Sequence, residues 1–325
     1  GFPPAHIVRH LLASFRRPLA CLLPSPSTLI IPCSSKLTPK AKALVVDLQN
    51  LLKPTGHFTR LIQSKNRLYE LALEIDELNT AIRGLKSNRA VVNSNTRLYL
   101  EATSLLAICY LRQEEIELAK PLIKEVLTND TVIKSARTRK QFRLEIIDRF
   151  NQETALYSLK NKDKEEFTKE ELQEQVGKIL MSQNESEIYT TLGKSVPQHT
   201  KYLLFEVHQY SLKQLPSAER LALPSPEEKI KDKEVGLTVF QSAKRVIYNS
   251  LCDKESEIYK VWYTNGMEII LSKGYISSAV LSCFNNIGIG MKLLSASIVA
   301  LILKFGLEIY CVKNKPSDLM ELRGK

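Results

Sequence analysis

Apolar residues recur at intervals of three and four along most of this chain, and helix-breaking residues rarely interrupt them. This spacing is typical of a helix that packs against another helix. It is clearest over 58–85, at Leu68, Leu71, Ile75, Leu78, Ile82 and Leu85. The 325 residues include only 12 glycines and 14 prolines, and the prolines gather in 1–40 and around 216–226. The pattern predicts an all-α fold, with an array of helical hairpins followed by a second, more apolar helical region.

We expect five parts along the chain. Three prolines followed by a run of charged residues mark an exposed linker between two helical regions. The parts are a basic, proline-rich tail at 1–40, a helical array at 41–213, a linker at 214–236, an apolar helical region at 237–315 and a short tail at 316–325.

The basic charge of the chain is concentrated near its beginning. The net charge is +11, but residues 1–46 hold six lysines and arginines and no acidic residue, which leaves 11 − 6 = +5 for the rest. A tail with this charge and with apolar residues at helical spacing is typical of a transit peptide, while the same composition also fits an unstructured segment. We expect the protein in the cytoplasm or, if the tail is a transit peptide, in a mitochondrion or plastid.

The most specific pattern lies in residues 100–130. Small, aromatic, small, bulky and medium-sized side chains follow one another there, at Ala107, Tyr110, Ala119, Ile123 and Val126. The stretch resembles a single tetratricopeptide repeat, in which small residues let two helices cross closely. Glu114 takes the place of the usual turn glycine, and no copy precedes or follows at a step of about 34 residues. The resemblance implies a helical hairpin in a scaffold that binds peptides.

A group of basic residues follows this stretch. The group consists of Lys134, Arg137, Arg139, Lys140 and Arg143, with no acidic residue between them. Such a group could bind phosphates or an acidic partner. The stretch lacks the repeated aromatic residues that stack on bases, and Glu145 and Asp148 follow at once, so a solvated helix face is the preferred interpretation and nucleic acid an unexpected partner.

Residues 275–303 carry one charged side chain, Lys292. A membrane-spanning helix needs about 20 apolar residues, and a lysine near its centre costs about 2.5–3.5 kcal/mol. The preferred interpretation is therefore a pair of helices buried as a core and broken between Asn285 and Gly290, with Gly288 and Gly290 at a turn or close contact. The alternative is that 275–312 enters a membrane.

The sequence contains no pattern that indicates a catalytic, cofactor or metal site. The six cysteines form no CxxC pair, and the five histidines lie at no ligand spacing from them. Cys109, Cys283 and Cys311 lie in apolar stretches and are expected as reduced core residues. His208 and Cys252 would form a base and a nucleophile only if the fold brought them together.

The expected function is that of a non-enzymatic helical scaffold or assembly subunit that binds another protein and needs no cofactor. One alternative is a membrane-associated protein that inserts 275–312. A second alternative is a helical protein that binds nucleic acid through the basic group. Thr168 and Glu171 also predict a capping box, a local structural signal at the start of a helix.

Overall fold

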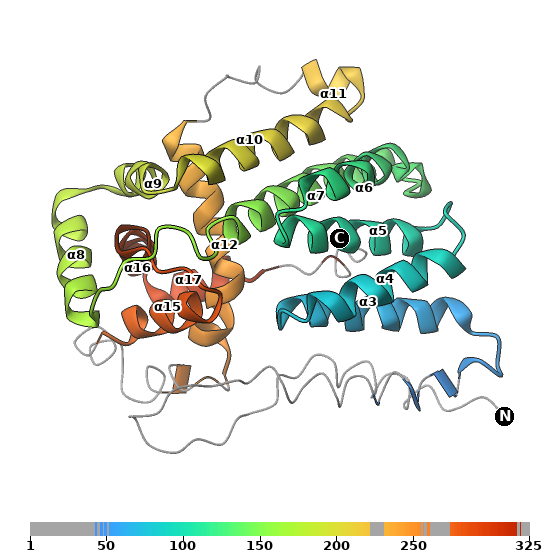
Figure 1. Cartoon of the computed structure of the whole chain (residues 1–325), viewed down its shortest axis with the longest axis horizontal. Helices are drawn as coiled ribbons and strands as arrows, with labels where there is room; N and C mark the ends of the chain where they lie inside the picture. Colours follow the sequence, from blue (N-terminus) through green and yellow to red (C-terminus); the bar gives the residue numbers. More distant parts are fainter. Residues whose placement is uncertain are drawn as a thin grey trace. The chain divides into compact units, whose positions relative to one another are not determined.

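The computed structural model describes residues 43, 46, 47, 49, 50, 52–221, 231–254, 256, 259, 260, 274–316 and 319. Within these residues the fold is all-α: thirteen α-helices and one short 3-10 helix occur, with no strand (Figure 1). The predicted fold class is confirmed. The predicted tail at 1–40 lies outside the described residues.

The chain divides into two compact units. Unit 1 comprises Gly1–Cys109, Thr128–Lys140 and Asp318–Lys325, and unit 2 comprises Tyr110–Leu127 and Gln141–Ser317. This division differs from the expected one at 214–236, because unit 2 includes residues on both sides of that segment. Helices α5 (Arg97–Arg112) and α7 (Ala136–Tyr157) begin in unit 1 and end in unit 2.

In unit 1, the region 58–85, where the apolar spacing is clearest, contains two helices. Helix α3 (Phe58–Glu74) and helix α4 (Leu78–Val91) pack together. Between them Asp76 adopts a φ of 60°, and the amides of Asp76 and Glu77 donate to the carbonyls of Leu73 and Ala72. These two bonds form a Schellman turn. The apolar spacing did not predict it, because Ile75 and Leu78 keep the three-residue step across the turn.

The contact between α3 and α4 depends on a glycine and on two buried amides. A Cβ atom on Gly84 would lie 2.0 Å from Cζ of Tyr69, so the glycine leaves room for the tyrosine ring against α4. Asn88 Nδ2 donates to Asn66 Oδ1 at 2.8 Å, and Asn66 Nδ2 donates to the carbonyl of Leu98 at 3.1 Å. Both amides are buried, and these bonds offset the cost of removing them from water.

Unit 2 contains most of the remaining helices. They are α6 (Ile116–Thr128), α8 (Lys169–Ser182), α9 (Glu185–Lys194), α10 (Gln198–Lys213), α11 (Ser217–Leu221), α12 (Asp232–Cys252), α15 (Tyr275–Asn286), α16 (Lys292–Phe305) and α17 (Leu307–Lys313). The 3-10 helix η1 (Asp130–Val132) precedes α7. Helix α11 and the start of α12 lie within the segment 214–236.

Side-chain caps start two of these helices. Thr168 Oγ1 accepts from the amide of Glu171 at 3.2 Å, and the Glu171 carboxylate accepts from the amide of Thr168 at 3.1 Å. The predicted capping box is therefore confirmed. Asn184 and Glu187 form a second box at the start of α9. Each box satisfies backbone amides that have no partner inside the helix.

Helices α9 and α12 cross at two glycines. A Cβ atom on Gly193 would lie 1.7 Å from the carbonyl oxygen of Asp232, and one on Gly236 would lie 1.9 Å from that of Tyr189. Each backbone therefore touches the other where the side chain is missing. This contact is closer than any residue with a Cβ atom allows, so it requires glycine at both positions.

Candidate functional site: the apolar C-terminal helices of unit 2

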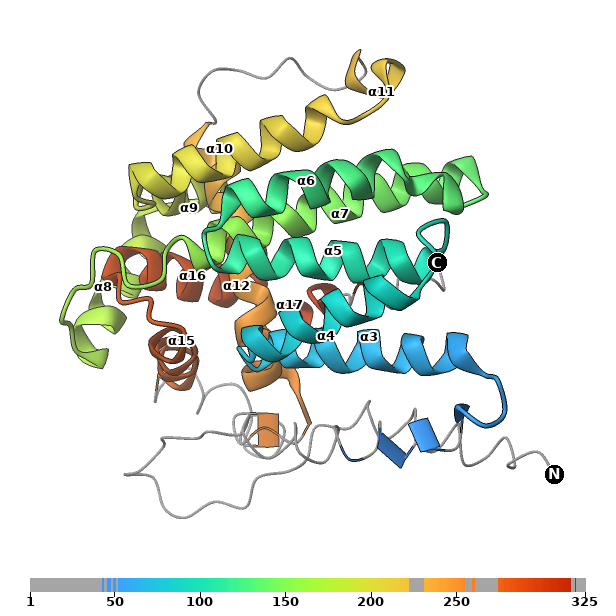
Figure 2. The ribbon, with the colours of Figure 1, turned by 45° about the vertical axis from the view of Figure 1, so that its right-hand side comes forward.

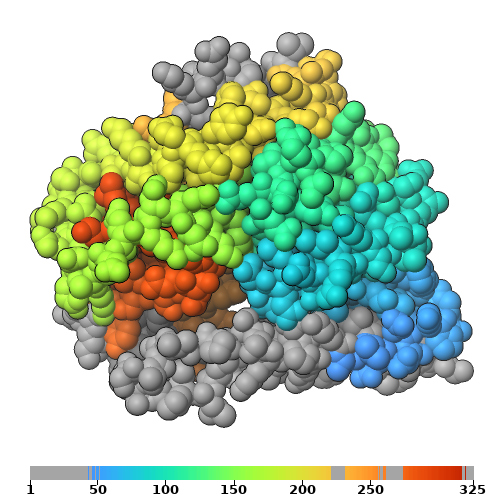
Figure 3. Space-filling view, viewed as in Figure 1, coloured from blue at the N-terminus to red at the C-terminus, as the bar shows by residue number. Residues whose placement is uncertain are grey.

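Helix α16 is apolar on all sides and forms the centre of unit 2. Nine consecutive residues, 294–302, are buried. The helix packs against α8, α9, α15 and α17 (Figure 2). In the space-filling view of Figure 3, little of α16, coloured red, is visible between the yellow-green residues of the neighbouring segments. A helix that is apolar all round belongs in a core, which agrees with the preferred interpretation of this region.

The predicted break between the two apolar helices is confirmed. Helix α15 ends at Asn286, and α16 begins at Lys292. Within the described residues no single helix has both the length and the apolar composition to cross a membrane. Helices α16 and α17 meet those two criteria as a pair, but they are bent by 93° at Gly306.

A segment from another part of unit 2 lies against this break. The amide of Asn161 donates to the carbonyl of Gly288 at 2.8 Å, and that of Glu165 to the carbonyl of Gly290 at 2.6 Å. Gly288 has a φ of 78°, and a Cβ atom there would lie 2.7 Å from Asn161 Oδ1. The expected turn and close contact at these glycines are confirmed. The Glu165 carboxylate also accepts from the amide of Lys292 at 3.0 Å, which places a negative charge at the start of α16.

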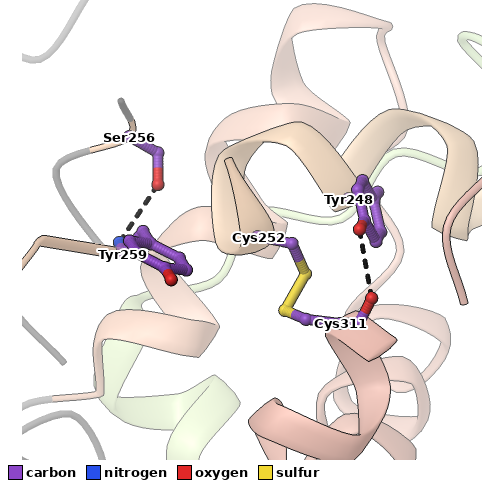
Figure 4. Close-up of a disulfide and its surroundings, with 5 residues drawn as sticks. All are labelled: Tyr248, Cys252, Ser256, Tyr259 and Cys311. Atoms are coloured by element: carbon purple, nitrogen blue, oxygen red, sulfur yellow. Dashed lines mark hydrogen bonds between the residues drawn. A yellow bond between two sulfur atoms is a disulfide. The ribbon is translucent and has the colours of Figure 1, made fainter. Parts of the chain in front are cut away.

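Three links join α12 to α17 and the residues after it. They start from Lys244, Tyr248 and Cys252, which are four residues apart and so lie on one face of α12. Lys244 Nζ donates to Asn314 Oδ1 at 2.9 Å. Tyr248 Oη donates to the carbonyl of Cys311 at 3.0 Å, and Cys252 forms a disulfide with Cys311 (Figure 4).

The disulfide corrects one expectation about the cysteines. Cys311 was expected as a reduced core residue, whereas its Cα lies 5.3 Å from that of Cys252 and the two sulfurs are bonded. The partners are 59 residues apart, and no local spacing in the sequence indicates their pairing. In the chain-entropy model, closing a loop of this length stabilises the fold by about 4 kcal/mol. Cys109 and Cys283 are buried, reduced thiols, as expected.

A tyrosine of α17 is buried without a partner for its hydroxyl. Tyr310 is 0% exposed, and its ring lies 6.4 Å from that of Phe240 on α12. Its Oη atom has no hydrogen-bond partner among the described residues. Burial raises the pKa of Tyr310, so the hydroxyl stays neutral. An unsatisfied buried hydroxyl costs about 1–3 kcal/mol, and this cost opposes the docking of α17.

Elsewhere in unit 2, two arginines share a buried glutamate. Glu153 on α7 lies 2.7 Å from Nε of Arg112 and 2.6 Å from Nε of Arg149, with all three side chains less than a tenth exposed. The Arg112 guanidinium also lies 4.6 Å from the centre of the Tyr157 ring. Burial would raise the pKa of Glu153, but Arg112 and Arg149 lower it below its ordinary value of 4.5. The carboxylate is therefore held in its charged form.

The residues of the predicted hairpin lie on α5 and α6. Ala107, Ala119, Ile123 and Val126 are each 0% exposed, and Tyr110 is partly exposed. Glu114, which stands where a glycine was expected, adopts a φ of 60° in the turn. The turn therefore has the left-handed backbone conformation that glycine usually adopts, although the residue is a glutamate.

The turn between α5 and α6 matches the turn between α3 and α4. The amides of Glu114 and Glu115 donate to the carbonyls of Leu111 and Tyr110, the pattern found at Asp76 and Glu77. Glu114 follows Asp76 by 38 residues, and with this shift the bounds of α5 and α6 agree with those of α3 and α4 to within one residue. The matching turns are therefore 38 residues apart, not the step of about 34 residues of a tetratricopeptide repeat.

The predicted basic group does not form one exposed patch. Lys134, Arg137 and Lys140 are exposed. Arg139 Nη1 donates to the carbonyl of Ile133 at 3.1 Å, and Arg143 is 8% exposed and pairs with Glu219. The sequence alone could not separate these roles, because Glu219 is distant along the chain.

The residues considered for chemistry do not come together as a reactive pair. Cys252 is in a disulfide, and His208 Nδ1 lies 2.9 Å from Asn151 Nδ2. Burial lowers the pKa of His208, which favours a neutral ring that accepts this hydrogen bond. In the part of the chain that the structure describes, no three His, Cys, Asp or Glu residues are placed to hold a metal ion.

We predict that Glu153→Gln destabilises the protein by about 3–5 kcal/mol at neutral pH, because it leaves two buried guanidinium groups without their carboxylate. Since the pKa of Glu153 is lowered in the fold, its contribution is complete above pH 4.5 and is lost as the pH falls through the folded value. Urea unfolding measured between pH 7 and pH 3 should therefore show that the difference in free energy of unfolding between variant and native protein becomes smaller in acid. The control is Glu174→Gln, which breaks an exposed pair with Lys178 and should change little. Equal effects of the two substitutions would contradict the assignment.

Comparison with known proteins assigns the chain to no family. No protein-family model matches it, and neither a curated protein nor a solved structure does. A proposal about function must therefore rest on the residues and contacts described above.

Proposed function

We propose that this chain is a non-enzymatic helical scaffold that binds a protein partner through exposed side chains of α4 and α6, the helices that follow its two matching turns. The observation that carries the proposal is the identical turn at Asp76 and Glu114, 38 residues apart. Helical hairpins that follow one another at a fixed step are the building unit of repeat scaffolds, which display extended surfaces to peptides and proteins.

The burial pattern of the second helices supports this proposal. Ala81 and Ala119 are both buried, as are Leu85 and Ile123, each pair being 38 residues apart. Lys86 and Lys124, also 38 residues apart, are both exposed. Helices α4 and α6 therefore bury and expose corresponding positions, as the second helices of repeats do.

The test is a charge reversal at both of these lysines. Native protein is used to capture partners from an extract of its source, and the dissociation constant of each purified partner is then measured by calorimetry. We predict that Lys86→Glu with Lys124→Glu weakens binding at least about tenfold, since each reversal opposes an acidic partner. Met181→Glu on α8, where the side chain is 91% exposed, is the control and should leave binding unchanged. A partner that binds both variants with native affinity would rule out binding through α4 and α6.

A second candidate function is membrane association through α16 and α17. The two helices have 14 and 7 residues with Gly306 between them, 22 in all. Straightened into one helix they would span about 33 Å, close to the hydrocarbon thickness of about 30 Å. In this account α16 is buried in the fold described above but can leave the core and enter a bilayer.

Flotation with vesicles of phosphatidylcholine and phosphatidylglycerol tests this second candidate. We predict that the native chain floats with the vesicles and resists alkaline extraction. Ile309→Lys is the informative variant: Ile309 is 50% exposed, so the fold tolerates lysine, whereas a charge inside an inserted helix is costly. The variant should therefore float several-fold less. Native protein that stays in the dense fraction, or a variant that floats equally, would exclude insertion of this pair.

A further inference from the structure

We propose that the Cys252–Cys311 disulfide is a redox-operated latch, which holds α17 against α12 and releases it when a dithiol reduces the bond. The inference goes beyond both candidate functions and depends on neither, since it concerns a change within the purified chain. Its basis is the way in which α17 is attached to unit 2.

The attachment of α17 is concentrated on one side and close to the disulfide. Of its seven residues only Leu307 and Tyr310 are buried. Glu308, Ile309, Val312 and Lys313 are exposed. The hydrogen bonds from Lys244 and Tyr248 of α12 and the disulfide from Cys252 end at Asn314 and Cys311. The covalent bond and the Tyr248 hydrogen bond thus act on the same residue (Figure 4).

Without the disulfide, the docking of α17 is weak. A helix of seven residues is too short to be stable on its own in water. One of its two buried side chains brings the unpartnered Tyr310 hydroxyl into the core. Gly306 joins α17 to α16 with a φ of 76° and no neighbouring atom within 4 Å of its would-be Cβ, so the joint has room to change direction. These properties suit an element that opens locally while the core stays folded.

Reduction requires a reductant that can reach the sulfurs. Cys252 and Cys311 are both partly exposed, whereas Cys283 is 7% and Cys109 is 0% exposed. One thiolate of the dithiol attacks one of the two protein sulfurs to form a mixed disulfide. The second thiol of the reagent then displaces that protein sulfur. The dithiol is oxidised to a cyclic disulfide, and Cys252 and Cys311 each gain a proton and become thiols. Two electrons are transferred in total.

The test is amide hydrogen exchange of the purified full-length chain before and after treatment with dithiothreitol. Alkylation and peptide mapping at Cys252 and Cys311 verify the redox state. We expect exchange in residues 307–313 to become at least about tenfold faster on reduction, with α16 remaining protected. Cys311→Ser should show the fast rate without reductant. Unchanged exchange in 307–313 after complete reduction overturns the latch, and so does an equal loss of protection in α16.

Two single-atom variants separate the latch from a general loosening. In the reduced protein, Tyr248→Phe removes the hydrogen bond to the Cys311 carbonyl and should speed exchange in 307–313 further. Tyr310→Phe removes the unpartnered hydroxyl and should slow it. Both substitutions remove a tyrosine hydroxyl, but they are expected to change the exchange rate of 307–313 in opposite directions. A change in the same direction for both would contradict the account of how α17 is held.

Discussion

Unit 2 depends on the contact between the backbones of α9 and α12 at Gly193 and Gly236. Both α9 and α15, which itself packs on α12, contact the central helix α16. The close approach of α9 and α12 therefore helps to enclose a helix that is apolar on every side. Burial of such a helix is the main favourable term available to this unit, because apolar area removed from water dominates folding free energy.

The polar groups buried in the chain are arranged around this packing. Glu153 holds two arginines, and the buried amides of Asn66 and Asn88 bond to each other in unit 1. Tyr310 is the contrast: it lies in the core without a partner for its hydroxyl. The carboxylate and the two amides fix the helices that carry them, while the unpartnered Tyr310 hydroxyl lies on the short helix that the disulfide holds. The stability of the fold and the proposed latch therefore both depend on which buried polar atoms have hydrogen-bond partners.

Local patterns in the sequence predicted the features that depend on neighbouring residues. Helical spacing indicated the all-α fold, the pair Thr168 and Glu171 indicated the capping box, and the residues from Asn285 to Gly290 indicated the break between α15 and α16. The turn at Asp76, which matches the turn predicted at Glu114, was missed, because an acidic residue occupies the left-handed position where glycine is the usual signal. The Cys252–Cys311 disulfide and the Arg112–Glu153 pair were missed because their partners are 59 and 41 residues apart, and only the fold brings them together.

The central structural claim is that α9 and α12 touch at two glycines and so enclose α16. Its most direct test is the free energy of unfolding of Gly193→Ala and Gly236→Ala, with Gly177→Ala on α8 as the matched control. Gly177 has no atom within 4 Å of its would-be Cβ, so alanine there should stabilise the protein by about 0.5–1 kcal/mol. The other two should destabilise it by about 2 kcal/mol or more, because a backbone must move to admit the methyl group. Stability gains of similar size at all three positions would contradict the claim.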